Sequence, residues 1–576
     1  MMRTIRRREP TTSVDLPGIP QVLSRVYASR GVTTVEELNP GLAGLLPPAT
    51  LKNAEAAAAR LHLALERDEP ILIVGDFDAD GATSTALAVH ALRACGCRKV
   101  GFLVPNRFEF GYGLTPGIVA LALDVSERPP GLIVTVDNGI SSIEGVEAAN
   151  AAGIQVLVTD HHLPGRELPD AEVIVNPNQP GCDFESKALA GVGVMFYVLL
   201  ALRARLREAG WFAARGLSEL NMAAYLDLVA LGTVADVVPL DKNNRILVQG
   251  GLERIRAARL RPGLAALLEV AGKDITQVAA SDLGFAAGPR LNAAGRLDDM
   301  SLGINCLLAE QPLEARQLAS TLDSMNRERQ LIERGMQEEA MAILARATLS
   351  ADNRPPAYVL YEKGWHQGVV GIVASRIKDR FHRPVIAFAD VDNEELKGSG
   401  RSIPGLHLRD VLDSVATQNP GLITRFGGHA MAAGLSLPVA ALETFSEAFT
   451  AAVEVTGASE AQAVLDTDGE LAAEDFSLDL AHQIRFGGPW GQHFPEPVFE
   501  GVFELVSQRI VGERHLKLTV REPGTRQVLD AIAFGVDLQR WPNEQAFRAQ
   551  LAYKLDINQF RGQTKLQLLV EQILAL

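Results

Sequence analysis

The fold is decided by one stretch, Ile71-Leu72-Ile73-Val74-Gly75-Asp76-Phe77-Asp78-Ala79-Asp80-Gly81, which joins an apolar run to a loop with three carboxylates. A short, continuous apolar run of this kind is typical of a strand buried on both faces of a parallel sheet. An Ala-rich segment, typical of a helix, follows as far as about Ala94. The stretch therefore predicts an α/β fold with an acidic loop at the carboxyl end of its first strand.

The same alternation of strand and helix continues to about residue 180. Four more strands are predicted, at 99–104, 132–136, 155–159 and 173–175. Two of them are followed at once by an acidic residue, namely Asp137 and Asp160. Because sites in open parallel sheets form at the carboxyl ends of the strands, we expect these carboxylates to converge with the acidic loop if the strands are neighbours.

The rest of the chain shows a different pattern in each part. Residues 190–300 are typical of helices with loops, 308–348 of a long charged connector made of one or two helices, 355–455 of a second strand–helix alternation, and 466–576 of a small barrel. We therefore expect an N-terminal segment at 1–49, an α/β domain at 50–307, a connector helix at 308–349, a smaller α/β domain at 350–457 and an all-β barrel at 466–576.

The composition, with 47% apolar and 22% charged residues, is that of an ordinary soluble protein. No apolar run approaches the roughly 20 residues of a membrane span, and no apolar segment follows the basic start, so neither a membrane contact nor a secretory signal is predicted. Four cysteines without a CxxC pair indicate a reducing compartment, and we expect the cytoplasm. The net charge of −15 argues mildly against a nucleic-acid partner, but residues 501–576 hold ten Lys and Arg against eight Asp and Glu.

The acidic loop at 76–80 predicts a metal site. Three carboxylates within five residues repel one another unless a cation neutralises them. A calcium loop of the EF-hand type would need a preceding helix and a Glu at its twelfth position, where this chain has a strand and Leu87. A solvated acidic turn remains the alternative for this segment taken alone.

Histidines join the carboxylates in Asp160-His161-His162. A mixed set of carboxylate and imidazole ligands favours Mn²⁺ or Mg²⁺ over a structural zinc. Asp236 lies in an apolar run, where a metal, a cap or a buried salt bridge would satisfy its charge, and Asp227 is a competing candidate. Two ions could clamp a phosphate and activate a water, so we predict a phosphodiester hydrolase without a nucleophilic side chain.

These segments, in this order, resemble the DHH phosphoesterase family, which is named for the triplet seen here as Asp160-His161-His162. The resemblance implies two ions, Mn²⁺ or Mg²⁺, and catalytic roles for Asp160 and for His162 beside the scissile phosphate. The metal ligands that it implies are Asp78, Asp80, Asp137 as the bridging ligand, His161 and Asp236. Some members have a His before the first motif, where this chain has Val74 and Asp76, and a metal contact of Asp76 is left open.

The second half of the chain narrows the resemblance. Gly427-Gly428-His429 looks like the GGH motif of the DHHA1 domain associated with this family. Segments 288–296, 364–371 and 398–402 resemble those of members that degrade single-stranded DNA, and the likeness covers about residues 20–576. The substrate-binding residues that it implies are Arg107, Arg290, Arg296, Ser399, Arg401, Gly428 and His429. Ser399 and Arg401, two residues apart on a strand, would point the same way and could together hold a phosphate.

The predicted architecture is α/β: a parallel-sheet DHH domain, a long connector helix, a smaller α/β DHHA1 domain and a C-terminal all-β barrel similar to an OB fold. The resemblance implies 5′→3′ hydrolysis of single-stranded DNA to mononucleotides in DNA repair and recombination, with a single-strand-binding protein and a helicase as partners. Two alternatives remain. A hydrolase of small phosphates would need no barrel, and an inactive nucleic-acid scaffold would need no complete set of acids and histidines.

Overall fold

The computed structural model of the chain describes residues 3–9, 15–39, 41–106, 109–125, 129–348, 355–391, 394–457, 462–560 and 562–576. The chain divides into two compact units. The smaller unit consists of residues 1–6 and 327–466, and the larger unit of residues 7–326 and 467–576. The larger unit contains the acidic loop, and the smaller one contains the predicted phosphate-binding strand.

The larger unit holds a five-stranded sheet in which every neighbouring pair is parallel. Its strands, in spatial order, are β3 (Val100–Leu103), β2 (Ile71–Gly75), β4 (Leu132–Val136), β5 (Gln155–Thr159) and β6 (Val173–Val175). The predicted parallel sheet is therefore confirmed. The three strands that lead into acidic residues, β2, β4 and β5, are adjacent, so their carboxyl ends lie side by side.

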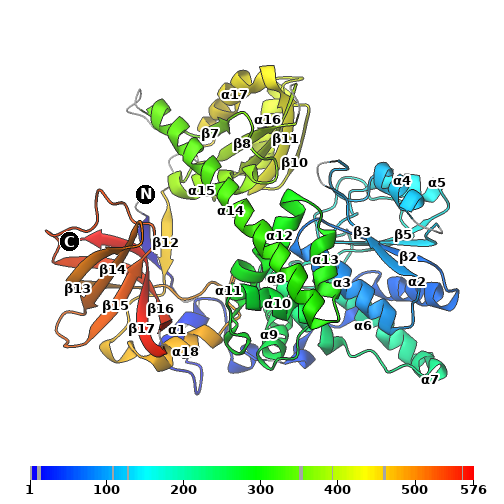
Figure 1. Cartoon of the computed structure of the whole chain (residues 1–576), viewed down its shortest axis with the longest axis horizontal. Helices are drawn as coiled ribbons and strands as arrows, with labels where there is room; N and C mark the ends of the chain where they lie inside the picture. The colour runs from blue at the N-terminus through cyan, green and yellow to red at the C-terminus, as the bar shows by residue number, and fades with distance from the viewer. Residues whose placement is uncertain are drawn as a thin grey trace. The chain divides into compact units, whose positions relative to one another are not determined.

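Helices cover both faces of this sheet. Helices α4 (Pro116–Val125) and α5 (Ile143–Ala151) lie on one face, and α2 (Ala54–Glu66), α3 (Ala79–Ala94) and α6 (Gly191–Glu208) lie on the other (Figure 1). The side chains of β2 alternate accordingly. Leu72 and Val74 join the core under α4 and α5, whereas Ile71 and Ile73 join the larger core. A strand buried on both faces needs the unbroken apolar run that the sequence shows.

A helical region follows the sheet, as predicted. Its helices are α7 (Trp211–Arg215), α8 (Leu226–Ala235), α9 (Lys242–Arg256), α10 (Pro262–Val270), α11 (Ala280–Asp282), α12 (Gly288–Leu297) and α13 (Ser301–Leu308). A π-helical segment, Leu283–Ala287, joins α11 to α12 without a break. The connector is one helix of 37 residues, α14 (Pro312–Thr348), which accommodates Gly335 in its interior.

The smaller unit is built on a mixed sheet with the strand order β10-β11-β9-β8-β7. Only the β7–β8 pair is parallel among these described strands. The strands are β7 (Tyr358–Tyr361), β8 (Val385–Asp390), β9 (Glu395–Arg401), β10 (Arg425–Gly428) and β11 (Ala432–Pro438), and the helices are α15 (Val370–Phe381), α16 (Leu408–Gln418) and α17 (Leu442–Val455). A short ribbon of β1 (Thr4–Arg7) and β12 (Val464–Thr467) links the chain's start to the end of this unit.

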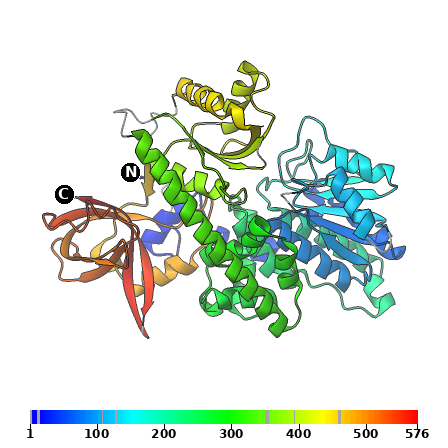
Figure 2. The same cartoon turned by 45° about the horizontal axis from the view of Figure 1, so that its top comes forward.

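The C-terminal part of the larger unit is a closed barrel with the strand order β13-β14-β15-β17-β16, seen in red and orange in Figure 2. The strands are β13 (Phe499–Val511), β14 (His515–Arg521), β15 (Val528–Ala533), β16 (Arg548–Phe560) and β17 (Gln563–Ala575), preceded by α18 (Leu478–Phe486). Closure leaves no free sheet edge. Across the described part of the chain, every helix is too short or too polar to cross a bilayer.

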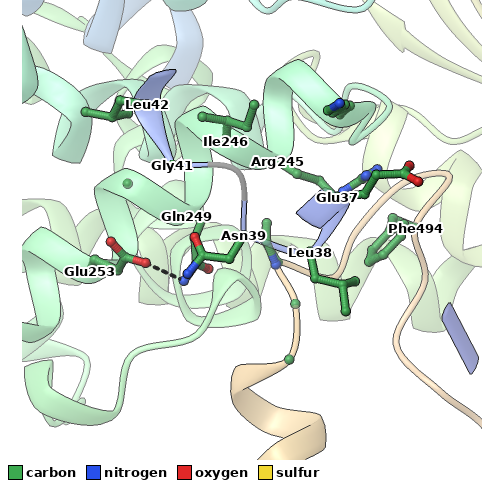
Figure 3. Close-up of a pocket in the computed structure, with 15 residues that line it drawn as sticks. Glu37, Leu38, Asn39, Gly41, Leu42, Arg245, Ile246, Gln249, Glu253 and Phe494 are labelled. Carbon is green, nitrogen blue, oxygen red and sulfur yellow. Dashed lines mark hydrogen bonds between the residues drawn. The ribbon is translucent and has the colours of Figure 1, made fainter. Parts of the chain in front are cut away.

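The barrel is joined to the helical region through a junction that includes α1 (Gln21–Ala28) and the loop after α18. The buried pair Arg30–Asp468, 2.6 Å apart, connects the segment after α1 to the residue that follows β12. Arg245 of α9 lies 4.4 Å from the ring centre of Phe494, beside a pocket of about 50 Å³ (Figure 3). The hydrophobic core runs through this junction from the sheet to the barrel, so both belong to one unit.

Candidate metal centre

The acidic loop turns directly from β2 into α3. Asp78 is the N-cap of α3, and its Oδ1 atom accepts hydrogen bonds from the backbone nitrogens of Asp80 at 2.9 Å and Gly81 at 3.0 Å. An aspartate at this position satisfies backbone donors that a helix start leaves without partners. The cap uses one oxygen of Asp78, and the second oxygen remains available to a ligand.

Asp80 is held in a narrow cradle. It is 1% exposed, and its carboxylate accepts from the backbone nitrogens of Gly191 at 2.6 Å and Val192 at 3.0 Å, in the first turn of α6. A Cβ atom at Gly191 would lie 2.5 Å from the Cβ atom of Asp137, and one at Gly232 would lie 2.8 Å from Oδ1 of Asp80. The positive end of the α6 dipole thus faces the carboxylate, and two glycines make room for it.

Asp137 follows β4 in a left-handed conformation, with a φ of 62°. This conformation is uncommon for a residue with a side chain and marks a functional turn when its surroundings enforce it. The side chain of the next residue, Asn138, supplies that enforcement, because its amide donates to the carbonyl oxygens of Val74 at 3.0 Å and Val136 at 2.9 Å. The turn therefore fixes Asp137 between the ends of neighbouring strands.

His161 and Asp236 complete the cluster. The Nε2 atom of His161 lies 3.1 Å from Oδ1 of Asp137 and 3.5 Å from Oδ2 of Asp236. Within the described residues, potential ligand atoms lie within 4.8 Å of one another in three groups. These groups are Asp76, Asp78 and Asp137; Asp80, His161 and Asp236; and Asp137, His161 and His162. Asp76 is thereby placed among the candidate ligands, a point that the sequence left open.

The electrostatics of the cluster fit divalent cations. Burial, together with the neighbouring Asp78 carboxylate, raises the pKa of Asp80 to about 7. Burial and nearby carboxylates also raise the pKa values of Asp137 and Asp236 well above their usual range. Among described residues, none donates a hydrogen bond to Oδ1 of Asp137 or Oδ2 of Asp236. Oxygen and imidazole ligands of this kind suit Mn²⁺ and Mg²⁺, and Asp137 belongs to two of the three groups.

Asp160 is not a member of these groups and instead holds His162. Its Oδ1 atom lies 2.8 Å from Nδ1 of His162 and accepts from the backbone nitrogens of His161 and His162, while Oδ2 accepts from Ile140. Burial alone would lower the pKa of His162, but the Asp160 carboxylate outweighs it and raises that pKa to about 9. In the absence of bound metal, the protonated form of His162 is therefore favoured near neutral pH, at the edge of the cluster.

Tyr112 also reaches the cluster, and sequence reasoning missed it. Its hydroxyl donates to the carbonyl oxygen of Asp137 at 3.2 Å and lies 3.2 Å from Nδ1 of His162. Its ring packs edge-on against Phe77, with 6.0 Å between ring centres. Tyr112 lies between two glycines with positive φ, Gly111 and Gly113, and this Gly-Tyr-Gly sequence is the signal that could have marked a special loop.

Asp227, the rival of Asp236, has a structural role. It is fully buried and forms an ion pair and a hydrogen bond with Arg261, whose backbone nitrogen also donates to it at 2.8 Å. Its charge is thus satisfied inside the helical region. Asp236, at the C-terminal end of α8, is the residue that reaches the cluster.

The predicted substrate-binding residues are distributed over both units. Arg290 in α12 forms an ion pair with Asp323 at 2.7 Å, and Arg296 lies in the last turn of the same helix. Ser399 and Arg401 lie on β9 of the smaller unit, where Nη1 of Arg401 donates to Oγ of Ser399 at 3.0 Å. Gly428 is the last residue of β10 in that unit, and His429 follows it directly. Arg107 lies outside the described residues.

Comparisons with known proteins agree with this architecture. The model of the DHH family N-terminal domain matches residues 70–233, that of the DHHA1 domain residues 354–455, and that of the RecJ OB domain residues 467–572. The single-stranded-DNA-specific exonuclease RecJ of Dickeya dadantii is 57% identical over 569 residues, which cover 98% of each chain. Identity at this level over almost the full length shows that the two proteins belong to one family.

Two solved structures are also similar. The crystal structure of RecJ from Thermus thermophilus in complex with Mn²⁺ has a TM-score of 0.77 and 31% identity, and the match covers 96% of this chain and 75% of that chain. The structure of the same protein with Mg²⁺ has a TM-score of 0.72 and 29% identity, with coverages of 96% and 74%. On these grounds, the chain belongs to the RecJ family of DHH phosphoesterases.

Proposed function

We propose that this chain is a two-metal exonuclease that hydrolyses single-stranded DNA from its 5′ end to mononucleotides. The observation that carries the proposal is the position of Asp137, which shares one group of ligand atoms with Asp76 and Asp78 and another with His161. The relatives named single-stranded-DNA-specific exonuclease, and the related structures with Mn²⁺ and Mg²⁺, support the same reading. The closed barrel supports a strand rather than a small phosphate as the substrate.

The residues of the cluster divide the work. Asp76, Asp78, Asp80, Asp137, His161 and Asp236 would hold the ions. When bound, two ions of this type activate a water and stabilise the charge of the phosphate and the leaving oxygen. His162, kept protonated by Asp160, places a positive donor beside the scissile phosphate. Tyr112 packs against His162 and the Asp137 carbonyl and limits how both can move.

The 5′ end is recognised by the smaller unit. Ser399 and Arg401 point to the same side of β9, and Gly371 leaves space beside them, because a Cβ there would lie 2.8 Å from Oγ of Ser399. A hydroxyl next to a guanidinium is a suitable phosphate site. Further contacts with the strand are assigned by the family resemblance to Gly428 and His429 in this unit and, separately, to Arg107, Arg290 and Arg296. A pocket for a terminal phosphate sets the 5′→3′ direction.

The finer biological setting also belongs to this proposal. We infer that the chain acts in DNA repair and recombination in the cytoplasm, on strands opened by a helicase and covered by a single-strand-binding protein. Support comes from its family and from four buried cysteines that form no disulfide, which suits a reducing compartment.

The test compares one oligonucleotide in several forms, in the presence of Mn²⁺. We expect a single strand labelled at its 5′ end to release labelled mononucleotide at once, and the same strand labelled at its 3′ end to shorten stepwise. Blunt duplex should be resistant. Cleavage of a dinucleotide with no cleavage of longer strands would favour a small-phosphate hydrolase instead. Binding without any cleavage would favour an inactive scaffold.

A further inference from the structure

A large groove in the larger unit is lined partly by the end of α8 and the residues that follow it. It has a volume of about 690 Å³, and its lining includes Val237, which directly follows Asp236, and Lys554 of barrel strand β16. Helix α11 lies on the side of the helical region that faces the barrel (Figure 1). A groove of this size takes a sizeable ligand, and it extends from Val237, the residue after Asp236, to the barrel.

Phe285 stands out among the residues that line this groove. It is 85% exposed, whereas its neighbours Leu283, Ala286 and Ala287 are buried. It lies in the π-helical segment Leu283–Ala287, and such segments are frequent at functional sites. A large aromatic ring displayed into a groove by an otherwise buried turn is well suited to contact a ligand.

The backbone that carries Phe285 is fixed to the metal centre. Gly284 packs against the end of α8, since a Cβ there would lie 3.2 Å from Cγ1 of Val234, two residues before Asp236. The segment continues into α12, where Oδ1 of Asn292 accepts from the backbone nitrogen of Ala79 in the acidic loop at 2.8 Å. The backbone at Phe285 is therefore held at a set position relative to the candidate ligands.

Each of the four basic side chains that line the groove already has a partner in the protein. Lys273 pairs with Asp282 at 2.7 Å and Lys554 with Glu496 at 2.9 Å, while Arg256 donates to the carbonyl oxygen of Val278 at 2.8 Å and Arg485 to that of Gln277 at 3.2 Å. The bases of a strand that passes here have planar faces that an aromatic ring can bind. We propose that Phe285 is a base-stacking residue, which binds one base of the DNA strand where it leaves the metal centre toward the barrel.

This inference rests on the proposed function, and kinetics test it with Phe285→Ala, Phe285→Trp and the control Leu313→Ala. Leu313 is 70% exposed in the same unit and does not line the groove. We expect Phe285→Ala to raise the KM for a long single strand about tenfold, within the range for loss of one stacked base. The kcat and the hydrolysis of a dinucleotide should not change. Phe285→Trp should restore the KM, and Leu313→Ala should not change it.

A series of substrates with one abasic residue, moved stepwise from the 5′ end, distinguishes stacking from a structural effect. At one position in the strand, the abasic residue should weaken binding to the wild type about tenfold. The same substrate should bind the Phe285→Ala variant as well as the intact strand does, because the missing base and the missing ring belong to a single interaction. Equal losses in both proteins at every position, or an unchanged KM in Phe285→Ala, would overturn the inference.

Binding of the same strands without divalent ions, followed by fluorescence anisotropy, separates this inference from the proposed function. If Phe285→Ala binds the strand more weakly but the wild type never cleaves DNA, the stacking role of Phe285 would stand and the proposed exonuclease activity would be refuted. If the protein cleaves intact and abasic single strands equally well with and without Phe285, the exonuclease activity would stand and the stacking role would be refuted.

Discussion

Nδ1 of His162 lies 2.8 Å from Oδ1 of Asp160, a buried carboxylate that accepts three backbone hydrogen bonds as well. This arrangement keeps His162 charged, with its pKa raised to about 9. Asp160 is therefore a positioning residue, and its negative charge is what His162 depends on.

Asp160→Asn keeps the shape of the side chain and removes that charge. We expect kcat to fall by about 10²-fold, the lower range for loss of a positioned proton donor, and the alkaline limb of the pH–rate profile to move toward neutral pH. The wild type should hold its rate up to about pH 9. Asp170→Asn, at an exposed carboxylate, is the matched control. An unchanged profile in Asp160→Asn would refute the role given to the pair.

Arg401→Ala tests the recognition of the 5′ end. Arg401 donates to Oγ of Ser399 at 3.0 Å, and a charged hydrogen bond to phosphate is worth about 1.5–3 kcal/mol. We expect kcat/KM to fall by at least about tenfold on strands with a 5′ phosphate and far less on strands with a 5′ hydroxyl. Lys363→Ala, at an exposed lysine of the same unit, should affect neither. Equal losses on both strands would exclude a dedicated phosphate site.

Gly191→Ala should damage the metal centre through packing alone. The added Cβ would lie 2.5 Å from the Cβ of Asp137, and overpacking of this kind costs about 1–3 kcal/mol of unfolding free energy. We expect this loss in urea denaturation, together with weaker Mn²⁺ binding. Gly335→Ala is a control of opposite sign, because nothing lies within 4 Å of its Cβ and alanine stabilises a helix interior by about 0.5–1 kcal/mol. Equal stability of the two variants would contradict the close packing of Gly191 against Asp137.

The metal-free protein should lose stability as the pH rises. The folded state raises the pKa of Asp80 to about 7, so between about pH 4 and pH 7 it holds a proton that the unfolded chain has released. The free energy of unfolding must then fall with rising pH across this window. Saturating Mn²⁺ should remove the slope, because the ions replace the protons. If the thermal midpoint of the metal-free protein did not depend on pH, the folded state would not raise the pKa of Asp80.

Much of this fold follows from the sequence, because each buried strand reads as an unbroken apolar run. Asp137 and Asp160 come directly after such runs, and parallel pairing of β4 with β5 was enough to bring them together. The barrel and the connector helix can also be recognised in the sequence, because the spacing of apolar residues changes where each of them begins. The candidate site residues themselves remain a prediction, although Asp137, His161 and Asp236 do meet in space.

Other parts of the site depend on contacts between distant segments, which no local pattern carries. The donors to Asp80 come from Gly191 and Val192, more than a hundred residues later in the chain. Asp227 and Asp236 have similar apolar surroundings in the sequence, and only the folded structure distinguishes them, with Arg261 beside Asp227 and His161 beside Asp236. Phe285 reads as an ordinary core residue, since the π-helical segment that turns it outward has no distinctive composition.

The central claim is that Asp137 joins two ion sites in one hydrolytic centre, and counting bound Mn²⁺ tests it most directly. Electron paramagnetic resonance of metal-free protein titrated with Mn²⁺ should show two bound ions per wild-type chain with magnetic coupling between them. In Asp137→Ala the coupling and the hydrolysis of single-stranded DNA should both disappear, while binding of the strand persists. One uncoupled ion in the wild type, or normal hydrolysis by Asp137→Ala, would contradict the account.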